Sequence, residues 1–347
     1  MHVPDGFFNA PVSVAAGAVA AGGLGLCLRG ARRELDDRTA PMAGLVAAFV
    51  FAAQMLNFPV AAGTSGHLLG GTLAAVLVGP YTAVLCVAVV LIVQAFFFAD
   101  GGITALGVNI TLMGIVATVA GYALFRLIMR AAPRRRAVVP VAAFAGAALS
   151  VPITALAFTG LFWLGGTAPL DVSSVALAMV GVHVLIGLGE GLITALTVSS
   201  VLAVRPDLVY GARGTAAPLV LRTAGGESEV AAPPVAPAPA PGRAGLRPVL
   251  AGGALVAVLL AGVASFYASA SPDGLEKVAQ DKGLNAQEQD HPLGGGPLAD
   301  YGVKGVASER LSVGVAGVAG VGITLLAGGA VFYAVRRRGR SAQRARA

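Results

Sequence analysis

The 347-residue sequence predicts an all-α integral membrane protein, with about seven transmembrane helices followed by a two-helix C-terminal module. Two observations support this prediction. Hydrophobic residues make up 56% of the chain and charged residues 12%, with a mean hydropathy of +0.80, a composition typical of membrane proteins rather than soluble domains. The apolar residues are also gathered in stretches, most of them near the ~20 residues that a helix needs to cross a bilayer.

Seven apolar stretches lie in the first 205 residues, and two more follow residue 246. The third stretch is short and rich in glycine, so it fits either a half-helix or a span shorter than the bilayer, and Gly79-Pro80 behind it is a natural break. The 48 glycines predict helices that pack closely through small residues. In chain order the stretches are residues 9–28, 42–60, 68–79, 82–98, 106–129, 137–164, 174–203, 247–268 and 311–335.

Clustered arginines predict the orientation of these spans. They follow the first, fifth and seventh stretches and also end the chain, so they occupy alternate loops, as the positive-inside rule expects of cytoplasmic loops. We therefore expect the N-terminus outside and the C-terminus in the cytoplasm. The net charge of +7 lies in runs that flank apolar spans, which argues against a nucleic-acid partner. The loop arginines are Arg29, Arg32, Arg33, Arg38, Arg126, Arg130, Arg134, Arg135, Arg136, Arg205 and Arg213.

Composition divides the chain into four parts. Residues 1–205 form the first membrane domain. Residues 206–246 contain AAPPVAPAPAPGR, which cannot bury enough apolar surface to fold and predicts an extended cytoplasmic linker. Residues 247–338 form the second membrane module, and residues 339–347 form a basic cytoplasmic tail. Cys27 and Cys86 lie inside apolar stretches, so neither a disulfide framework nor a thiolate metal site is indicated.

The opening MHVPDGFFNAP suggests a metal chelate. It carries no basic residue, unlike a cleaved signal sequence, so we expect it to be retained. The amine of Met1, the amide nitrogen of His2 and the Nδ1 of its imidazole would close a five-membered and a six-membered ring. Such a planar nitrogen set suits Ni(II) or Cu(II), and less obviously Co(II). Pro4 keeps the amine out of the following helix. The alternative is that His2 is a frayed terminal residue.

A fourth donor is needed, and His67 in GTSGHLLGG is the candidate. It follows the second stretch and is therefore expected at the outer face, on the same side as the N-terminus. The alternative is a helix-capping or interfacial histidine. His291 lies in a polar, glycine-rich loop and is expected to be solvent-exposed.

His183 and Glu190 are the main ionisable pair inside the spans. Seven residues apart on a helix, they share one face, and intramembrane ionisable groups are costly enough to suggest a positioning or coupling function. The alternative is an internal hydrogen bond that holds this helix to a neighbour. The other polar residues within or beside the spans are expected to pair with one another or with backbone groups; they are Gln54, Asn57, Gln94 and Asn109.

These motifs carry a family resemblance. MHVPDGF, GTSGHLLGG and HVLIGLGEGLIT resemble the substrate-binding membrane subunit of cobalt and nickel energy-coupling-factor (ECF) transporters, the CbiM/NikM family, and SPDGLEKVAQDKG resembles their small PDGLE-type accessory subunit (CbiN/NikN-like). The resemblance covers nearly the whole chain apart from the linker. It implies that Met1, His2 and His67 bind the metal, that the host is a prokaryote with the chain in its plasma membrane, and that a transmembrane coupling (T) subunit and two cytoplasmic ATPase subunits are partners.

In PDGLEK the resemblance favours a metal-loading or gating role for Asp273 and Glu276 outside the membrane. The alternative is a Pro-Asp-Gly turn followed by a solvated, charged helix, which turn chemistry explains well enough for Pro272 and Gly274.

The predicted function is therefore import of Ni(II) or Co(II) by a substrate-binding component of an ECF-type ABC transporter. No G-x-x-x-x-G-K-[ST] sequence is present, so energy must come from other subunits, and no cofactor other than the transported metal is expected. The family serves both nickel supply and cobalamin biosynthesis, and the choice of metal stays open. The alternatives are a membrane metalloenzyme, against which the lack of an H-E-x-x-H motif near His67 counts, and a passive metal channel.

Overall fold

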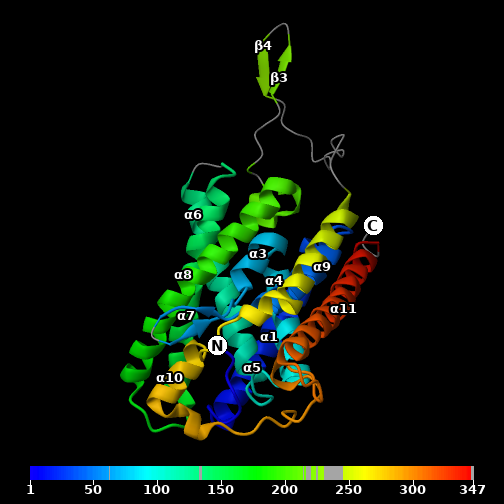
Figure 1. Cartoon of the computed structure of the whole chain (residues 1–347). Helices are drawn as coiled ribbons and strands as arrows, with labels where there is room; N and C mark the ends of the chain where they lie inside the picture. Colours follow the sequence, from blue (N-terminus) through cyan, green and yellow to red (C-terminus); the bar gives the residue numbers. More distant parts are fainter. Residues whose placement is uncertain are drawn as a thin grey trace.

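The structure, a computed structural model, describes residues 1–61, 63–132, 135–213, 215, 220–223, 226–229 and 245–344. Helices dominate it, and strands are confined to two short antiparallel pairs (Figure 1). Within the described residues seven helical segments are long and apolar enough to cross a membrane, five of them before residue 205 and two after residue 245. The prediction of an all-α, multi-pass membrane protein is confirmed.

Two of the membrane-spanning helices begin at polar side-chain caps, and the first, third and fifth spans end at basic residues that the sequence places in loops. Asn9 accepts a hydrogen bond from Val12 N at the start of the first helix, and Asp171 accepts one from Ser174 N at the start of the fifth span. The spans are α1 (Ala10–Glu34), α4 (Pro80–Val93) with the π-helical η1 (Gln94–Phe98), α5 (Leu106–Asn109) with η2 (Ile110–Val116) and α6 (Ala117–Ala131), α7 (Val138–Gly165), α8 (Val172–Val204), α9 (Leu246–Gly262) with η5 (Ala264–Tyr267), and α11 (Glu309–Arg344).

Two of the predicted stretches form shorter helices. α2 (Thr39–Gln54) ends earlier than expected, because the chain turns into β1 (Phe58–Pro59), which pairs with β2 (Ser65–Gly66). α3 (Gly71–Val78) has eight residues, all buried, and at 1.5 Å per residue it is about 12 Å long, well short of a bilayer. It is bounded by Gly70 at φ 81° and Gly79 at φ 102°, conformations that only glycine adopts easily. Its length fits the half-helix of the two options that the sequence left open.

The C-terminal module packs directly on the first domain. α9 and α11 lie side by side against α2 (Figure 1). Small residues make this approach possible: a Cβ at Gly320 would lie 2.1 Å from the Phe51 ring, and one at Gly44 would lie 3.3 Å from the backbone of Gly329. The two modules therefore share one core.

The bundle has two chemically different ends. Arg336 of α11 pairs with Asp37 behind α1, so the C-terminal ends of both helices lie together, on the same side as the linker (Figure 1). The opposite end carries the N-terminus and α10 (Gly274–Lys282) with the short helices η6 (Leu284–Gln287) and η7 (Ala299–Tyr301).

The linker is more structured than an extended chain where it is described. It contains η3 (Pro206–Leu208), η4 (Tyr210–Ala212) and a hairpin of β3 (Val220–Thr223) and β4 (Gly226–Glu229). Pairing of their backbone groups gives these two segments a local structure that composition did not predict. The AAPPVAPAPAPGR run lies outside the described residues. α11 also continues to Arg344, so most of the predicted tail is helical, and residues 345–347 lie outside the described part.

Candidate metal site

The N-terminal segment is inserted into the bundle instead of fraying from it. Asn109 holds Val3 on both sides, because its Oδ1 accepts from Val3 N at 2.8 Å and its Nδ2 donates to Val3 O at 3.0 Å. Gly102 N also donates to Val3 O at 2.9 Å, and Asp5 accepts from Thr104 N at 2.7 Å. Met1 is consequently only 3% exposed. The frayed-terminus alternative for these residues does not fit this geometry.

Met1 and His67 meet at the inner end of this segment. His67 lies between β2 and α3, and its Nδ1 faces Leu68 O at 3.0 Å, which leaves Nε2 in direct contact with the amine of Met1. The His2 ring stacks on the His67 ring, with centroids 5.0 Å apart and planes 24° apart. The structure thus brings together the three residues that the sequence analysis selected.

The imidazole of His2 does not face the amine. Its Nδ1 lies 3.3 Å from Asp100 Oδ1, and its Nε2 lies 3.1 Å from Gln94 Oε1. Burial lowers the pKa of His2 to about 4, an effect that the Asp100 carboxylate only partly offsets, so the ring is neutral and can donate a lone pair to a metal. A chelate through Nδ1 requires the ring to turn away from Asp100.

Asp273 of the C-terminal module reaches the same site. Its Oδ2 lies 2.6 Å from the amine of Met1 and 3.3 Å from His67 Nε2. Burial alone would raise the pKa of this carboxyl, but the Met1 ammonium and His67 outweigh it and hold the pKa well below its usual value. The other oxygen, Oδ1, caps α10 by accepting from Glu276 N at 2.9 Å. Asp273 can therefore cap the turn before α10 with one oxygen and contact the candidate site with the other, so the two interpretations of PDGLEK do not exclude each other.

The PDGLE segment is docked on the His67 segment by hydrogen bonds that Ser65 donates to its backbone carbonyls. Ser65 N donates to Pro272 O at 2.9 Å, and Ser65 Oγ donates to Ser271 O at 2.7 Å. Gly274 follows at a close approach to α8, where a Cβ would lie 2.6 Å from Ile186 Cδ1 and 2.9 Å from His183 Cε1. A glycine at this position lets the segment approach far enough for Asp273 to reach Met1.

Glu190 and His183 lie beside this segment on α8. Glu190 accepts hydrogen bonds from Leu69 N at 2.6 Å and from Gly70 N at 2.9 Å. This is the geometry of a hydrogen-bonded contact between α8 and a neighbouring segment. Leu69 and Gly70 follow His67 closely in the chain. His183 Nδ1 faces Met179 O of its own helix at 2.6 Å, and its Nε2 points toward Gly274. Glu190 is thus placed to position the His67 segment, and His183 to contact the PDGLE segment.

Two glutamines extend the polar network between helices. Gln94 Nε2 donates to Gln54 Oε1 at 2.9 Å, and Gln54 Nε2 donates to Leu69 O at 3.0 Å. Together with Asn109 they pair with one another or with backbone groups, as expected. Asn57 takes part through its main chain, where its carbonyl accepts from Ser269 N at 2.7 Å.

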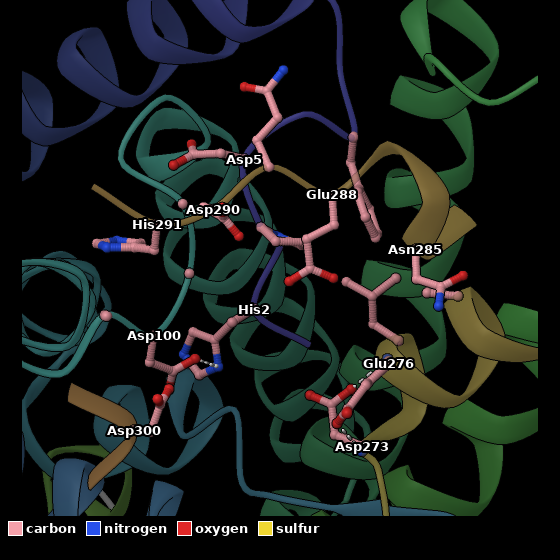
Figure 2. Close-up of a pocket in the computed structure, with 18 of the residues that line it drawn as sticks. His2, Asp5, Asp100, Asp273, Glu276, Asn285, Glu288, Asp290, His291 and Asp300 are labelled. Atoms are coloured by element: carbon pink, nitrogen blue, oxygen red, sulfur yellow. Dashed lines mark hydrogen bonds and ion pairs between the residues drawn. The ribbon is translucent and has the colours of Figure 1, made fainter. Parts of the chain in front are cut away.

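An acidic vestibule leads to His2 (Figure 2). Its volume is about 510 Å³, and a loop of the C-terminal module forms one wall, anchored where Gln289 N donates to Asp5 O at 3.0 Å. His291 lies in this wall and is half-buried, so the expectation that it is solvent-exposed was wrong. Carboxylates line the vestibule and give it a negative electrostatic potential; they belong to Asp5, Asp100, Asp273, Glu276, Glu288, Asp290 and Asp300.

Within the described residues, no group of three or more His, Cys, Asp or Glu side chains is arranged to hold a metal ion. The candidate site differs from such clusters because it includes main-chain nitrogens of Met1 and His2 as potential donors.

The comparison with known proteins covers both modules of the chain. Residues 2–208 match the family described as the cobalt uptake substrate-specific transmembrane region. The chain belongs to this family. Residues 247–337 match the PDGLE domain, so the chain is a fusion of the two. Family membership supports a component of a metal transporter rather than an enzyme, and with the seven apolar helices it supports a multi-pass membrane protein.

Relatives match either the whole fused chain or a part of it. The chain is 34% identical over 343 residues to a putative fused nickel transport protein, NikMN, of Archaeoglobus fulgidus, covering 99% of this chain and 100% of the relative. It is 40% identical over 184 residues to the cobalt transport protein CbiM of Sorangium cellulosum, covering 51% and 80%. A solved structure of a transition metal transporter is 28% identical with a TM-score of 0.53, covering 62% of this chain and 100% of that one.

Proposed function

We propose that the chain captures Ni(II) or Co(II) at the outer face of a prokaryotic plasma membrane and delivers it inward as the substrate-binding component of an ECF-type ABC transporter. The observation that carries this proposal is the buried contact between the amine of Met1 and His67 Nε2, with the His2 ring stacked on His67. A terminal amine and an imidazole held together in a buried site offer two of the nitrogen donors that a planar metal site uses.

The proposed donors are the Met1 amine, the amide nitrogen and Nδ1 of His2, and His67 Nε2. The contact between His67 Nδ1 and Leu68 O favours the tautomer in which Nε2 carries the lone pair. A deprotonated amide in a planar set favours nickel, and relatives are named as both nickel and cobalt transport proteins. Either metal is the proposed substrate, supplying nickel enzymes or cobalamin biosynthesis.

Asp273 gives the PDGLE module a part in this cycle. Its carboxylate contacts the Met1 amine and His67, two of the proposed donors. A metal that binds them must displace this carboxylate, which is itself a ligand for a divalent cation and stands at the inner end of the vestibule. We assign the module a loading role, Glu190 the positioning of the His67 segment, and His183 the coupling of α8 to Gly274.

The proposed domains follow the sequence analysis. Residues 1–205 bind the metal, residues 206–246 form a cytoplasmic linker, residues 247–338 form the accessory module and residues 339–347 form a cytoplasmic tail. The arginine-rich helix ends and the linker lie together at one end of the bundle, which supports a cytoplasmic location for that end. A T subunit and two ATPase subunits would dock there and supply the energy.

Metal uptake into cells tests this proposal. Cells that co-express the chain with its T and ATPase subunits should accumulate Ni(II) or Co(II), and accumulation should disappear when the ATPase P-loop lysine is substituted. His67→Ala should abolish both uptake and high-affinity binding at equal membrane expression, because one donor is lost. Uptake that persists without active ATPase subunits would indicate a passive channel. Hydrolytic activity of the purified protein would be needed to favour a metalloenzyme.

A further inference from the structure

The C-terminal module reaches His2 through a second contact that is separate from Asp273. The hydroxyl of Tyr301, in η7, donates to Asp100 Oδ2 at 2.5 Å. The other oxygen of the same carboxylate, Oδ1, lies 3.3 Å from His2 Nδ1. One carboxylate therefore joins a phenol of the accessory module to the nitrogen of His2 that the proposed chelate requires.

The backbone is strained at both ends of this contact. Three non-glycine residues among those described have positive φ: Ala99 at 54°, Asp300 at 53° and Tyr301 at 55°. This left-handed conformation is unfavourable for residues that carry a Cβ. Ala99 directly precedes Asp100. Tyr301 carries the phenol, and Asp300 directly precedes it. Strain that gathers at the two partners of one hydrogen bond points to a functional constraint on that bond.

The phenol is held in place by aromatic packing and remains a donor. Its ring stacks on Phe98 with centroids 4.9 Å and planes 23° apart, and it lies 6.2 Å from the Phe51 ring. Burial and the Asp100 carboxylate raise the pKa of the Tyr301 hydroxyl well above its ordinary value, so it stays protonated. The hydroxyl therefore holds the side chain of Asp100 in this orientation.

A series of polar contacts also links His2 to the segment that carries His67. His2 Nε2 faces Gln94 Oε1 at 3.1 Å, and Gln94 is joined through Gln54 to Leu69 O. Both ring nitrogens therefore face oxygen acceptors, and because the neutral ring carries a single N–H it donates to one of them at a time, to Asp100 Oδ1 when the proton is on Nδ1. Turning Nδ1 toward a metal breaks the contact with Asp100.

We propose that Tyr301 is a positioning residue of the metal site, which holds Asp100 against His2 Nδ1 and so keeps the imidazole turned away from the chelate. The inference rests on the proposed function and adds a role for a residue of the accessory module. The contact between Asp100 Oδ1 and His2 Nδ1 exists only while the ring is turned away, so it favours that arrangement over the chelate, and Tyr301 acts by holding Asp100 in place for it. Tyr301 therefore weakens metal binding and speeds metal release, which lets a site of four nitrogen donors exchange its metal.

Tyr301→Phe tests this role because it removes the hydroxyl and keeps the ring that packs on Phe98. Without the hydroxyl, Asp100 is no longer held against His2 Nδ1, and the arrangement with the ring turned away from the chelate is less favoured. The purified full-length variant should therefore bind Ni(II) about tenfold more tightly. It should also release Ni(II) to a chelator more slowly by a similar factor. Tyr267→Phe is the matched control, since it removes a hydroxyl from an 81% exposed tyrosine of the same module and should change neither quantity.

A double-mutant cycle separates positioning from a general structural effect. Asp100→Ala should also tighten binding, and adding Tyr301→Phe to it should have no further effect, because the phenol acts through Asp100. The ligand-field absorption of bound Ni(II) should be the same in every variant. Unchanged or weaker binding in Tyr301→Phe, or additive effects in the cycle, would overturn the inference. If His67→Ala still abolishes binding in that case, the proposed function stands without it; if His67→Ala binds normally, the proposed function fails.

Discussion

An uncleaved N-terminal extension is expected to eliminate high-affinity metal binding without altering any side chain. The amine of Met1 lies between His67 Nε2 and Asp273 Oδ2, the latter at 2.6 Å, and Met1 is 3% exposed. An extension converts this ammonium into an uncharged peptide nitrogen. The added residues also need space beside the buried Met1, so they disrupt the contacts that hold Met1 and Val3 inside the bundle.

The size of the effect follows from the buried ion pair and the lost donor. Removing one member of a buried pair costs about 3–5 kcal/mol. Asp273 is 16% exposed and keeps His67 at 3.3 Å, so we expect the lower end of that range. About 3 kcal/mol corresponds to a factor on the order of 100 in the equilibrium between the inserted and released N-terminus. Metal affinity should fall further still, because one of four nitrogen donors is also removed.

The assay compares three forms of the full chain at equal membrane expression. One form carries a long N-terminal tag, the second is the same protein after a protease has exposed Met1, and the third carries a tag at the C-terminal end, on the opposite side of the bundle. Metal binding, measured by titration calorimetry, and metal uptake should be lost in the first form, restored in the second and normal in the third. A long tag is preferable, because one added residue could shift the chelate by a position and retain some affinity. Equal affinity in the first and third forms would refute the chelate and leave His2 as a bystander.

Three further substitutions probe the contacts around the site. Gly274→Ala forces a Cβ to 2.6 Å from Ile186, so it should lower the free energy of unfolding by about 1–3 kcal/mol and weaken metal loading. Gly295→Ala, with open space around it, is the control. Equal melting temperatures of the two variants would contradict the close contact at Gly274. Glu190→Gln replaces a carboxylate that accepts two backbone hydrogen bonds by an amide whose single oxygen can accept only one of them well. We expect the free energy of unfolding, measured by thermal unfolding, to fall by about 1.5–3 kcal/mol and metal binding to weaken. A stable variant with normal affinity would argue against a positioning role for Glu190. Asn109→Ala removes both bonds to Val3 and should release the N-terminus at a cost of about 1–3 kcal/mol, seen as faster amide exchange at residues 1–5 and lower affinity; protection equal to that of the wild type would show that other contacts suffice.

Much of the fold could be predicted from the sequence because hydropathy acts locally. A helix in a bilayer must satisfy its own backbone, so an apolar run of sufficient length predicts a span wherever it lies in the chain. The nine predicted stretches all contain helices, including the short α3. What composition did not reveal was the hairpin of β3 and β4 and the early end of α2, because both depend on pairing between strands and not on hydropathy.

Local chemistry also predicted part of the site. Adjacent Met1 and His2 can form chelate rings with no help from the fold, so two residues and their backbone are enough to suggest nitrogen ligands. Pairing them with His67 already needed the topology of the chain and the family resemblance. The structure brought these three together, and it also turned the His2 ring toward Asp100, which no local pattern predicts.

Hydropathy, charge and neighbouring donors determined the class of protein, its spans and the first candidate ligands, since each of these depends on residues close together in the chain. Tertiary structure alone decided how the accessory module meets the site. Asp273 lies 272 residues from Met1, and Tyr301 lies 201 residues from Asp100, so no spacing in the sequence relates them. Their contacts depend on α9 and α11 packing against α2 and on a glycine at position 274 that admits the PDGLE segment. Those are properties of packed surfaces, which exist only once the chain has folded.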